Sequence, residues 1–144
     1  MYQKILVPLD GSEFAERALG AAIDLAKPAD AKIHLFTVLD GHLEEAFQDI
    51  GVVEHLPPED VARAHLSGQA AEVADHGVST TSAILTSRHA AEQIVREAEA
   101  VGADLIVMTT HGRSGLRRWL LGSVAEKVLR VSPVPVLLCP IRET

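Results

Sequence analysis

Short, almost uninterrupted runs of Val, Ile and Leu alternate along this chain with longer segments that have the period of amphipathic helices. The runs are residues 5–9, 31–38, 77–85, 104–108 and 134–139. Continuous apolar runs are typical of strands buried on both faces, and helices between successive strands make the strands parallel. The order β-α-β-α-β-α-β-α-β predicts one doubly wound α/β domain over residues 1–144, with a five-stranded parallel sheet and helices on both faces.

Composition agrees with this fold and argues against several classes of function. Aromatic residues are only 3% of the 144, so the core must be aliphatic, and the net charge of -7 speaks against nonspecific binding to nucleic acid. The lone Cys139 excludes an intrachain disulfide and a multi-cysteine zinc cluster. No apolar run approaches the roughly 18–20 residues that span a bilayer, and the first residues do not read as a signal peptide. We therefore expect a cytoplasmic protein with no membrane partner.

Capping residues predict where several helices begin and end. Ser12 and Ser87 are predicted N-caps, and Pro58 is a predicted first helical residue. Gly102 is predicted to end its helix in the left-handed conformation. The first helix is predicted to bury one stripe: Phe14, Ala18, Leu19, Ala22, Leu25 and Ala26.

Two segments interrupt the regular pattern. Ser and Thr alternate through 77–85, which suits a strand at the sheet edge. The stretch 39–58 is long for a connection in this class and contains glycines, acids and paired prolines. It is either a partly helical excursion that moves over a site or a surface insertion without a role.

Turn residues follow two of the predicted strands, where open α/β sheets bind ligands. The first strand leads into residues 10–12 and the fourth into residues 109–115. In the second segment Gly112 and Gly115 permit backbone angles that let successive N–H groups converge on an anion, and Arg113 adds positive charge. Residue chemistry alone leaves a simple tight turn as an equal alternative.

The last predicted helix offers a second anion-binding feature. Gly122 and Ser123 are predicted to open it, with Ser123 as both its cap and a phosphate contact. Other nucleotide and catalytic motifs are missing: the chain has no Walker loop, no G-x-G-x-x-G after the first strand, no H-E-x-x-H and no G-x-S-x-G. No catalytic residue is predicted.

Two groups of residues together resemble the universal stress protein family. Residues 4–12 are similar to its opening, and residues 107–115, 121–125 and 134–137 to its closing half. The resemblance covers essentially the whole chain and is least characteristic over 39–58. It implies a Rossmann-like fold of the adenine-nucleotide α-hydrolase type and an ATP-binding regulatory protein of the stress response.

The ATP-binding motif of that family, G-2x-G-9x-G-[ST], fits this chain with one departure. Gly112, Gly122 and Ser123 match its last three elements, whereas Thr109 stands where the first glycine belongs. A side chain at that position would either crowd the ribose and α-phosphate or be tolerated with its Cβ pointing away.

The resemblance also implies a ligand set. Asp10 would lie near the nucleotide and help to hold a divalent ion such as magnesium, and Pro8 and Val38 would flank the adenine. The residues implied at the ribose and phosphates are Met108, Thr109, Gly112, Gly122, Ser123, Val124 and Ala125.

The residues of the last predicted strand indicate that the protein associates with a second copy of itself. Prolines at 133, 135 and 140 surround its apolar residues, and proline is confined to sheet edges. Because an apolar edge needs a cover, we expect an isologous homodimer through residues 134–139, as the family resemblance also implies; a monomer with a covered edge is the alternative.

Three functions stay open at this point. The chain is a nucleotide-binding regulator with an unidentified protein partner, an interaction module that binds no nucleotide, or a slow ATP hydrolase. Thr109 is the feature that favours the second, and the lack of a positioned general base speaks against the third.

Overall fold

The computed structural model describes residues 1–11, 13–39, 58–110 and 121–140. Strands and helices alternate as predicted. The elements, in chain order, are β1 (Lys4–Pro8), α1 (Glu13–Ala29), β2 (Lys32–Leu39), α3 (Pro58–Asp75), β3 (Thr80–Thr86), α4 (Ala90–Val101), β4 (Leu105–Thr109), α5 (Ser123–Val131) and β5 (Val136–Cys139).

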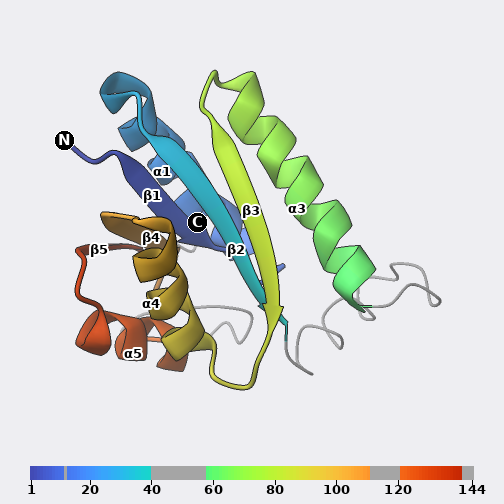
Figure 1. Cartoon of the computed structure of the whole chain (residues 1–144), viewed down its shortest axis with the longest axis vertical. Helices are drawn as coiled ribbons and strands as arrows, with labels where there is room; N and C mark the ends of the chain where they lie inside the picture. Colours follow the sequence, from blue (N-terminus) through green and yellow to red (C-terminus); the bar gives the residue numbers. More distant parts are fainter. Residues whose placement is uncertain (12, 40–57, 111–120, 141–144) are drawn as a thin grey trace.

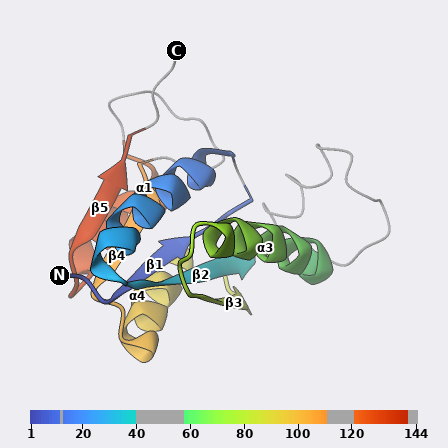
Figure 2. The same ribbon diagram turned by 90° about the horizontal axis from the view of Figure 1, so that it is seen from above.

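The five strands form one parallel sheet in the order β3-β2-β1-β4-β5. Helices α1 and α3 cover one face, and α4 and α5 cover the other (Figures 1 and 2). Strands β3 and β5 are the two edges, as their Ser/Thr and proline content predicted. The predicted doubly wound α/β fold is confirmed.

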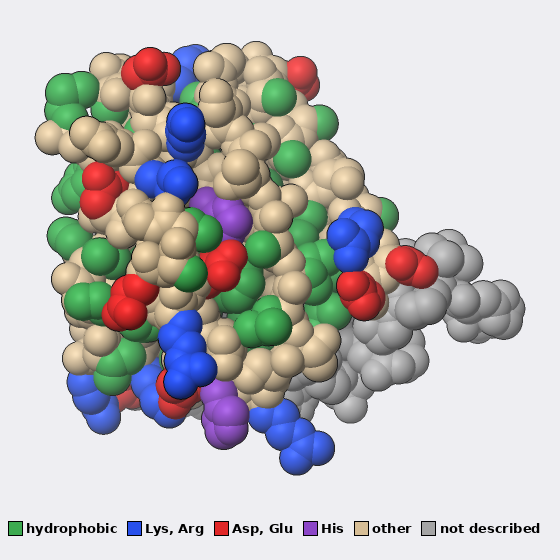
Figure 3. Space-filling model, viewed as in Figure 1, with side chains coloured by type: hydrophobic (Ala, Val, Ile, Leu, Met, Phe, Trp, Pro, Cys, Tyr) green, Lys and Arg blue, Asp and Glu red, His purple; other side chains and the backbone are tan. Residues whose placement is uncertain are grey.

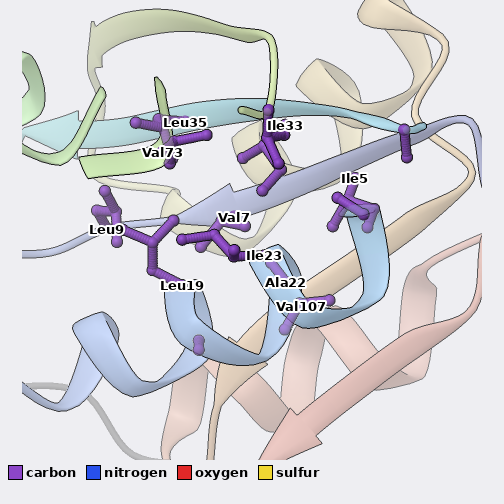
Figure 4. Close-up of a cluster of buried hydrophobic side chains, with 14 of the residues drawn as sticks. Ile5, Val7, Leu9, Leu19, Ala22, Ile23, Ile33, Leu35, Val73 and Val107 are labelled. Atoms are coloured by element: carbon purple, nitrogen blue, oxygen red, sulfur yellow. The ribbon is translucent and has the colours of Figure 1, made fainter. Parts of the chain in front are cut away.

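Alternation along the strands divides the buried side chains into two layers. On β1, Ile5 and Val7 face α1 and α3, whereas Leu6 faces α4 and α5. Figure 4 shows the first layer, in which Val7 of β1 lies against Leu19 and Ile23 of α1. Burial on both faces is why the strands read as continuous apolar runs.

The α1 stripe differs from the prediction at one position. Leu25 is exposed, and Ile23 is buried in its place. The helix turns Ile23 toward the sheet beside Leu19 and Ala22, whereas Leu25 lies beyond the edge of that stripe. The side chain of Phe14 lies outside the described residues.

Helix ends follow the sequence only in part. Pro58 is the first residue of α3, as predicted. Gly102 ends α4 with φ 72°, and its N–H is directed to the carbonyls of Ala98 and Glu99. Ser87 is not the cap of α4: the cap position is His89, whose N–H donates to Ser87 Oγ at 3.0 Å. Ser12 lies outside the described residues, as does nearly all of 39–58.

One strand boundary bears on function. Strand β4 was expected to end at Met108 and instead includes Thr109, which pairs with Cys139 of β5. Thr109 is therefore a strand residue, and the connection to α5 begins after it. Among the described helices, none is both long and apolar enough to cross a membrane.

Candidate functional site

The strand order reverses between β1 and β4, which are neighbours in the sheet although they lie far apart in the sequence. From β1 the chain passes to α1 on one face, and the chain that follows β4 returns as α5 on the opposite face. Ligands of open α/β sheets bind beyond the carboxyl ends of the strands at such a reversal. The two turn segments singled out in the sequence both begin here.

Strands β1 and β4 are hydrogen-bonded to each other at their amino ends. Their pairing stops before either strand reaches its carboxyl end. The Asp104 carboxylate accepts from the N–H groups of Gln3 and Lys4 at 2.9 and 3.1 Å. The paired register between the strands covers Ile5–Leu6 and Leu105–Ile106, although β1 continues to Pro8 and β4 to Thr109. The outer neighbours stay paired to the strand ends, since Pro8 aligns with Phe36 and Thr109 with Cys139. At the β1–β4 junction the two strands therefore extend beyond their paired register.

Backbone hydrogen bonds fix the segments around this junction. Leu9 N–H donates to the Phe36 carbonyl at 2.8 Å, which holds the chain leaving β1 against β2. Gly11 follows with φ 85°, a left-handed conformation that favours glycine. The chain leaving β4 is held in the same way, because Thr110 N–H donates to the Cys139 carbonyl at 3.1 Å.

The start of α5 is tied directly to the end of β4. Gly122 N–H donates to the Thr110 carbonyl at 2.7 Å, and the Gly122 carbonyl accepts from Glu126 N–H at 2.9 Å. Gly122 is the N-cap in an extended conformation, and no side chain caps the helix. The predicted cap, Ser123, is instead the first helical residue, because Gly122 already occupies the cap position. The next N–H groups have no partner within the helix and, with the helix dipole, favour an anion.

A side-chain ion pair holds α5 against α4. Lys127 of α5 contacts Glu92 of α4. The hydrogen bond from Lys127 is the main reason that the pKa of the exposed Glu92 carboxyl lies below its usual value. Together with buried Ala125 and Val128, this pair fixes the helix that carries the predicted phosphate contacts.

Three predicted nucleotide contacts lie on one face of the sheet. Met108 and Val38 both pack in the layer under α4 and α5, and alternation along β1 places Pro8 with Leu6 on that face. They come from β4, β2 and β1, three adjacent strands, near their carboxyl ends. Half-buried Asp10 follows β1 at the same end.

The remaining predicted residues divide into three groups. Ser123 and Val124 are exposed at the start of α5, and Gly122 and Ala125 are buried there. Thr109 is buried at the end of β4. Gly112, Arg113 and Gly115 lie outside the described residues, so their predicted contacts stay predictions.

Sequence reasoning missed Thr110. Its carbonyl holds Gly122, and its N–H bonds to β5, so it joins the strand end to the helix that begins the predicted phosphate site. Both contacts use backbone atoms, which leave no signal in residue type.

Comparison with known proteins agrees with this geometry. The model of the universal stress protein family matches residues 1–140. A universal stress protein of Methanocaldococcus jannaschii is 38% identical over 143 residues, which cover 96% of this chain and 82% of that protein.

Two solved structures are similar over nearly their whole length. The protein MJ0577 has a TM-score of 0.80 at 29% identity, covering 100% of this chain and 99% of that one. A universal stress protein solved in complex with cAMP has a TM-score of 0.69 at 25% identity, covering 96% and 97%. The chain belongs to the universal stress protein family.

Proposed function

We propose that this protein binds an adenine nucleotide, ATP with magnesium, beyond the carboxyl ends of β1 and β4, and acts as a cytoplasmic regulator of the stress response. The observation that carries the proposal is the bond from Gly122 N–H to the Thr110 carbonyl, which holds the α5 N-terminus at the strand-order reversal. A helix N-terminus at that place favours phosphate. The relative solved with cAMP shows that an adenine nucleotide binds to another member of this fold.

The residues present fit a magnesium ion that arrives with the nucleotide. Among the described residues, no group of three or more His, Cys, Asp or Glu side chains could hold a metal by themselves. Magnesium is commonly held by one or two carboxylates together with substrate phosphates and water. Asp10, at the end of β1, is the carboxylate that we assign to this role.

Charge on the surface argues against a nucleic-acid partner. The chain carries a net charge of -7, and on the face seen in Figure 3 the described residues intersperse acidic and basic side chains with no continuous basic area. Binding to a nucleic-acid backbone needs such an area.

We further propose that the protein is a homodimer through the β5 edge, residues 134–139. Strand β5 pairs with β4 on one side only, and Leu137 on it is 40% exposed. Leu129 and Val131 on α5 are also exposed large hydrophobic residues. An apolar edge of this kind is stable when a second copy covers it.

A charge placed on α5 tests nucleotide binding without harming the fold. Val124 is exposed in the first turn of α5, where an aspartate complements the helix dipole but opposes a phosphate. In calorimetric titration with ATP and magnesium we expect Val124→Asp to weaken binding by about tenfold, the effect of about 1.4 kcal/mol of repulsion. Thermal stability should stay equal or rise.

The matched control is Val124→Asn, which has the same shape without the charge and should keep ATP affinity within about threefold. No binding of ATP by the unmodified protein would overturn the proposal and favour an interaction module that binds no nucleotide.

A simple first measurement supports the titration. With one Trp and one Tyr, the chain absorbs weakly near 280 nm, so co-purified nucleotide visibly raises the ratio of absorbance at 260 nm to that at 280 nm.

A further inference from the structure

Thr109 stands where the ATP-binding motif implied by the family resemblance has its first glycine, and its place in β4 determines which way its side chain points. Along β4, Leu105 and Val107 pack in the layer under α1, whereas Ile106 and Met108 pack under α4 and α5. Because side chains alternate along a strand, Thr109 lies on the α1 face with Val107. Cys139, the partner of Thr109 on β5, packs against the same α1 layer.

Those predicted adenine and phosphate contacts that the structure describes on β2, β4 and α5 lie on the other face. Helix α5 packs there through Ala125 and Val128, and Met108 and Val38 belong to the same layer. The Thr109 side chain is only 8% exposed and is therefore enclosed on the α1 side of the sheet. It does not share a face with the start of α5.

Backbone conformation gives an independent argument. Among the described residues other than glycine, Asp30 is the only one with a positive φ, so Thr109 has an ordinary strand conformation. A glycine is needed where φ is positive or where a Cβ would block a close approach. Thr109 has no positive φ, and its Cβ lies on the face opposite to the α5 N-terminus. Neither condition therefore calls for a glycine here.

We propose that Thr109 forms the α1-side wall beneath the nucleotide, outside the volume of the ribose and phosphates, so that this protein binds nucleoside triphosphate without the first motif glycine. The inference rests on the proposed function. The nucleotide then contacts β4 through the Met108 side chain and the strand backbone, and the Thr109 side chain packs beside Cys139.

The test compares three substitutions at this position by calorimetric titration with ATP and magnesium. Thr109→Gly restores the motif, Thr109→Ala keeps only the Cβ, and Thr109→Val keeps the shape without the hydroxyl. We expect all three to stay within about threefold of the unmodified affinity. We also expect Thr109→Gly to have the lowest melting temperature, because a buried strand residue loses its side chain and gains backbone freedom.

Two binding results would overturn the inference while the proposed function stands. Affinity about tenfold tighter in Thr109→Gly would show that the side chain crowds the ligand. Affinity about tenfold weaker in Thr109→Val and Thr109→Ala would show that the hydroxyl contacts it. If neither the unmodified protein nor Thr109→Gly binds ATP, the proposed function and this inference both fail.

A second measurement needs no nucleotide. In NOE spectra of the unliganded protein, the Thr109 methyl should show cross-peaks to the Cys139 side chain and none to the Ala125 methyl. Cross-peaks to Ala125 would place Thr109 on the α5 face and overturn the inference whatever the titrations show.

Discussion

His34 on β2 is a polar side chain buried against the sheet, with 5% of its surface exposed. Its Nε2 lies 2.7 Å from a carboxylate oxygen of Glu97 on α4, and its Nδ1 lies 2.6 Å from Thr81 Oγ1 on β3. A carboxylate only accepts, so Nε2 donates the proton of that bond. One imidazole therefore links the inner strand β2 to a helix and to the edge strand β3.

Removing the carboxylate should be costly. Glu97→Ala leaves a buried ring N–H without its acceptor, and we expect a loss of about 1–3 kcal/mol in the free energy of unfolding, measured with urea. Glu99→Ala, an exposed glutamate on the same helix, is the control and should change stability by less than about 0.5 kcal/mol. Equal losses from the two substitutions would contradict the role given to His34.

Cys139 allows a test that depends on pH. Desolvation raises the pKa of its thiol. The protonated form is therefore favoured in the folded protein, and stability from this group is present below the unfolded pKa and lost as pH rises through the folded pKa. We expect the folded protein to react with iodoacetamide more slowly at pH 9 than the urea-unfolded protein. Equal rates in the two states would show that the thiol is not desolvated.

Residue identity predicted which segments meet at the candidate site, but not the face of the sheet on which each side chain lies. The ends of β1 and β4 and the start of α5 were predicted, and the structure brings them together at the carboxyl end of the sheet. The face on which Thr109 lies was not predictable, because it depends on where β4 ends and on its register with Cys139. A shift of one residue would reverse every side chain of the strand.

The exact ends of the helices were also only partly predictable from the sequence. The existence of α4 and α5 follows from apolar periodicity, yet the predicted caps Ser87 and Ser123 are displaced from the cap positions by two residues and one residue. In α5 the cap is fixed by a long-range backbone bond to Thr110, which local sequence does not reveal. Gly102 was predictable because a left-handed residue after a helix favours glycine on local grounds.

Gly102, which caps the end of α4, and Gly68, within α3, should respond oppositely to substitution by alanine. Gly102 ends α4 at φ 72°, and Gly102→Ala should cost about 1 kcal/mol because the left-handed conformation strains an L residue. Gly68 lies within α3, where an added Cβ meets nothing within 4 Å. Gly68→Ala should therefore stabilise by about 0.5–1 kcal/mol. Urea unfolding measures both, and a loss of stability in Gly68→Ala would contradict this account of α3.

The two edge strands of the sheet, β3 and β5, differ in how polar they are. Strand β3 carries Thr and Ser and is covered on one face by α3, whereas β5 is short, apolar and flanked by prolines. Because β5 is the more apolar of the two described edges, we expect one isologous contact and a closed dimer, not a chain of molecules.

Lysine substitutions at matched positions test that asymmetry. Leu137 on β5 and Leu85 on β3 are each 40% exposed. Leu137→Lys should convert the proposed dimer to a monomer in light scattering after gel filtration, because a buried charge without a partner opposes the contact. Leu85→Lys should leave the dimer intact. A monomeric unmodified protein, or dissociation by Leu85→Lys alone, would reject the β5 contact.

We propose that an adenine nucleotide binds where β1 and β4 end and α5 begins. Titration of ¹⁵N-labelled protein with ATP and magnesium, followed by amide chemical shifts, tests it most directly. We expect the largest shifts at Asp10, Thr109 and Thr110 and in the first turn of α5, with little change at the opposite end of the sheet near Asp104. An unchanged spectrum, or shifts centred on α3 and β3, would contradict it.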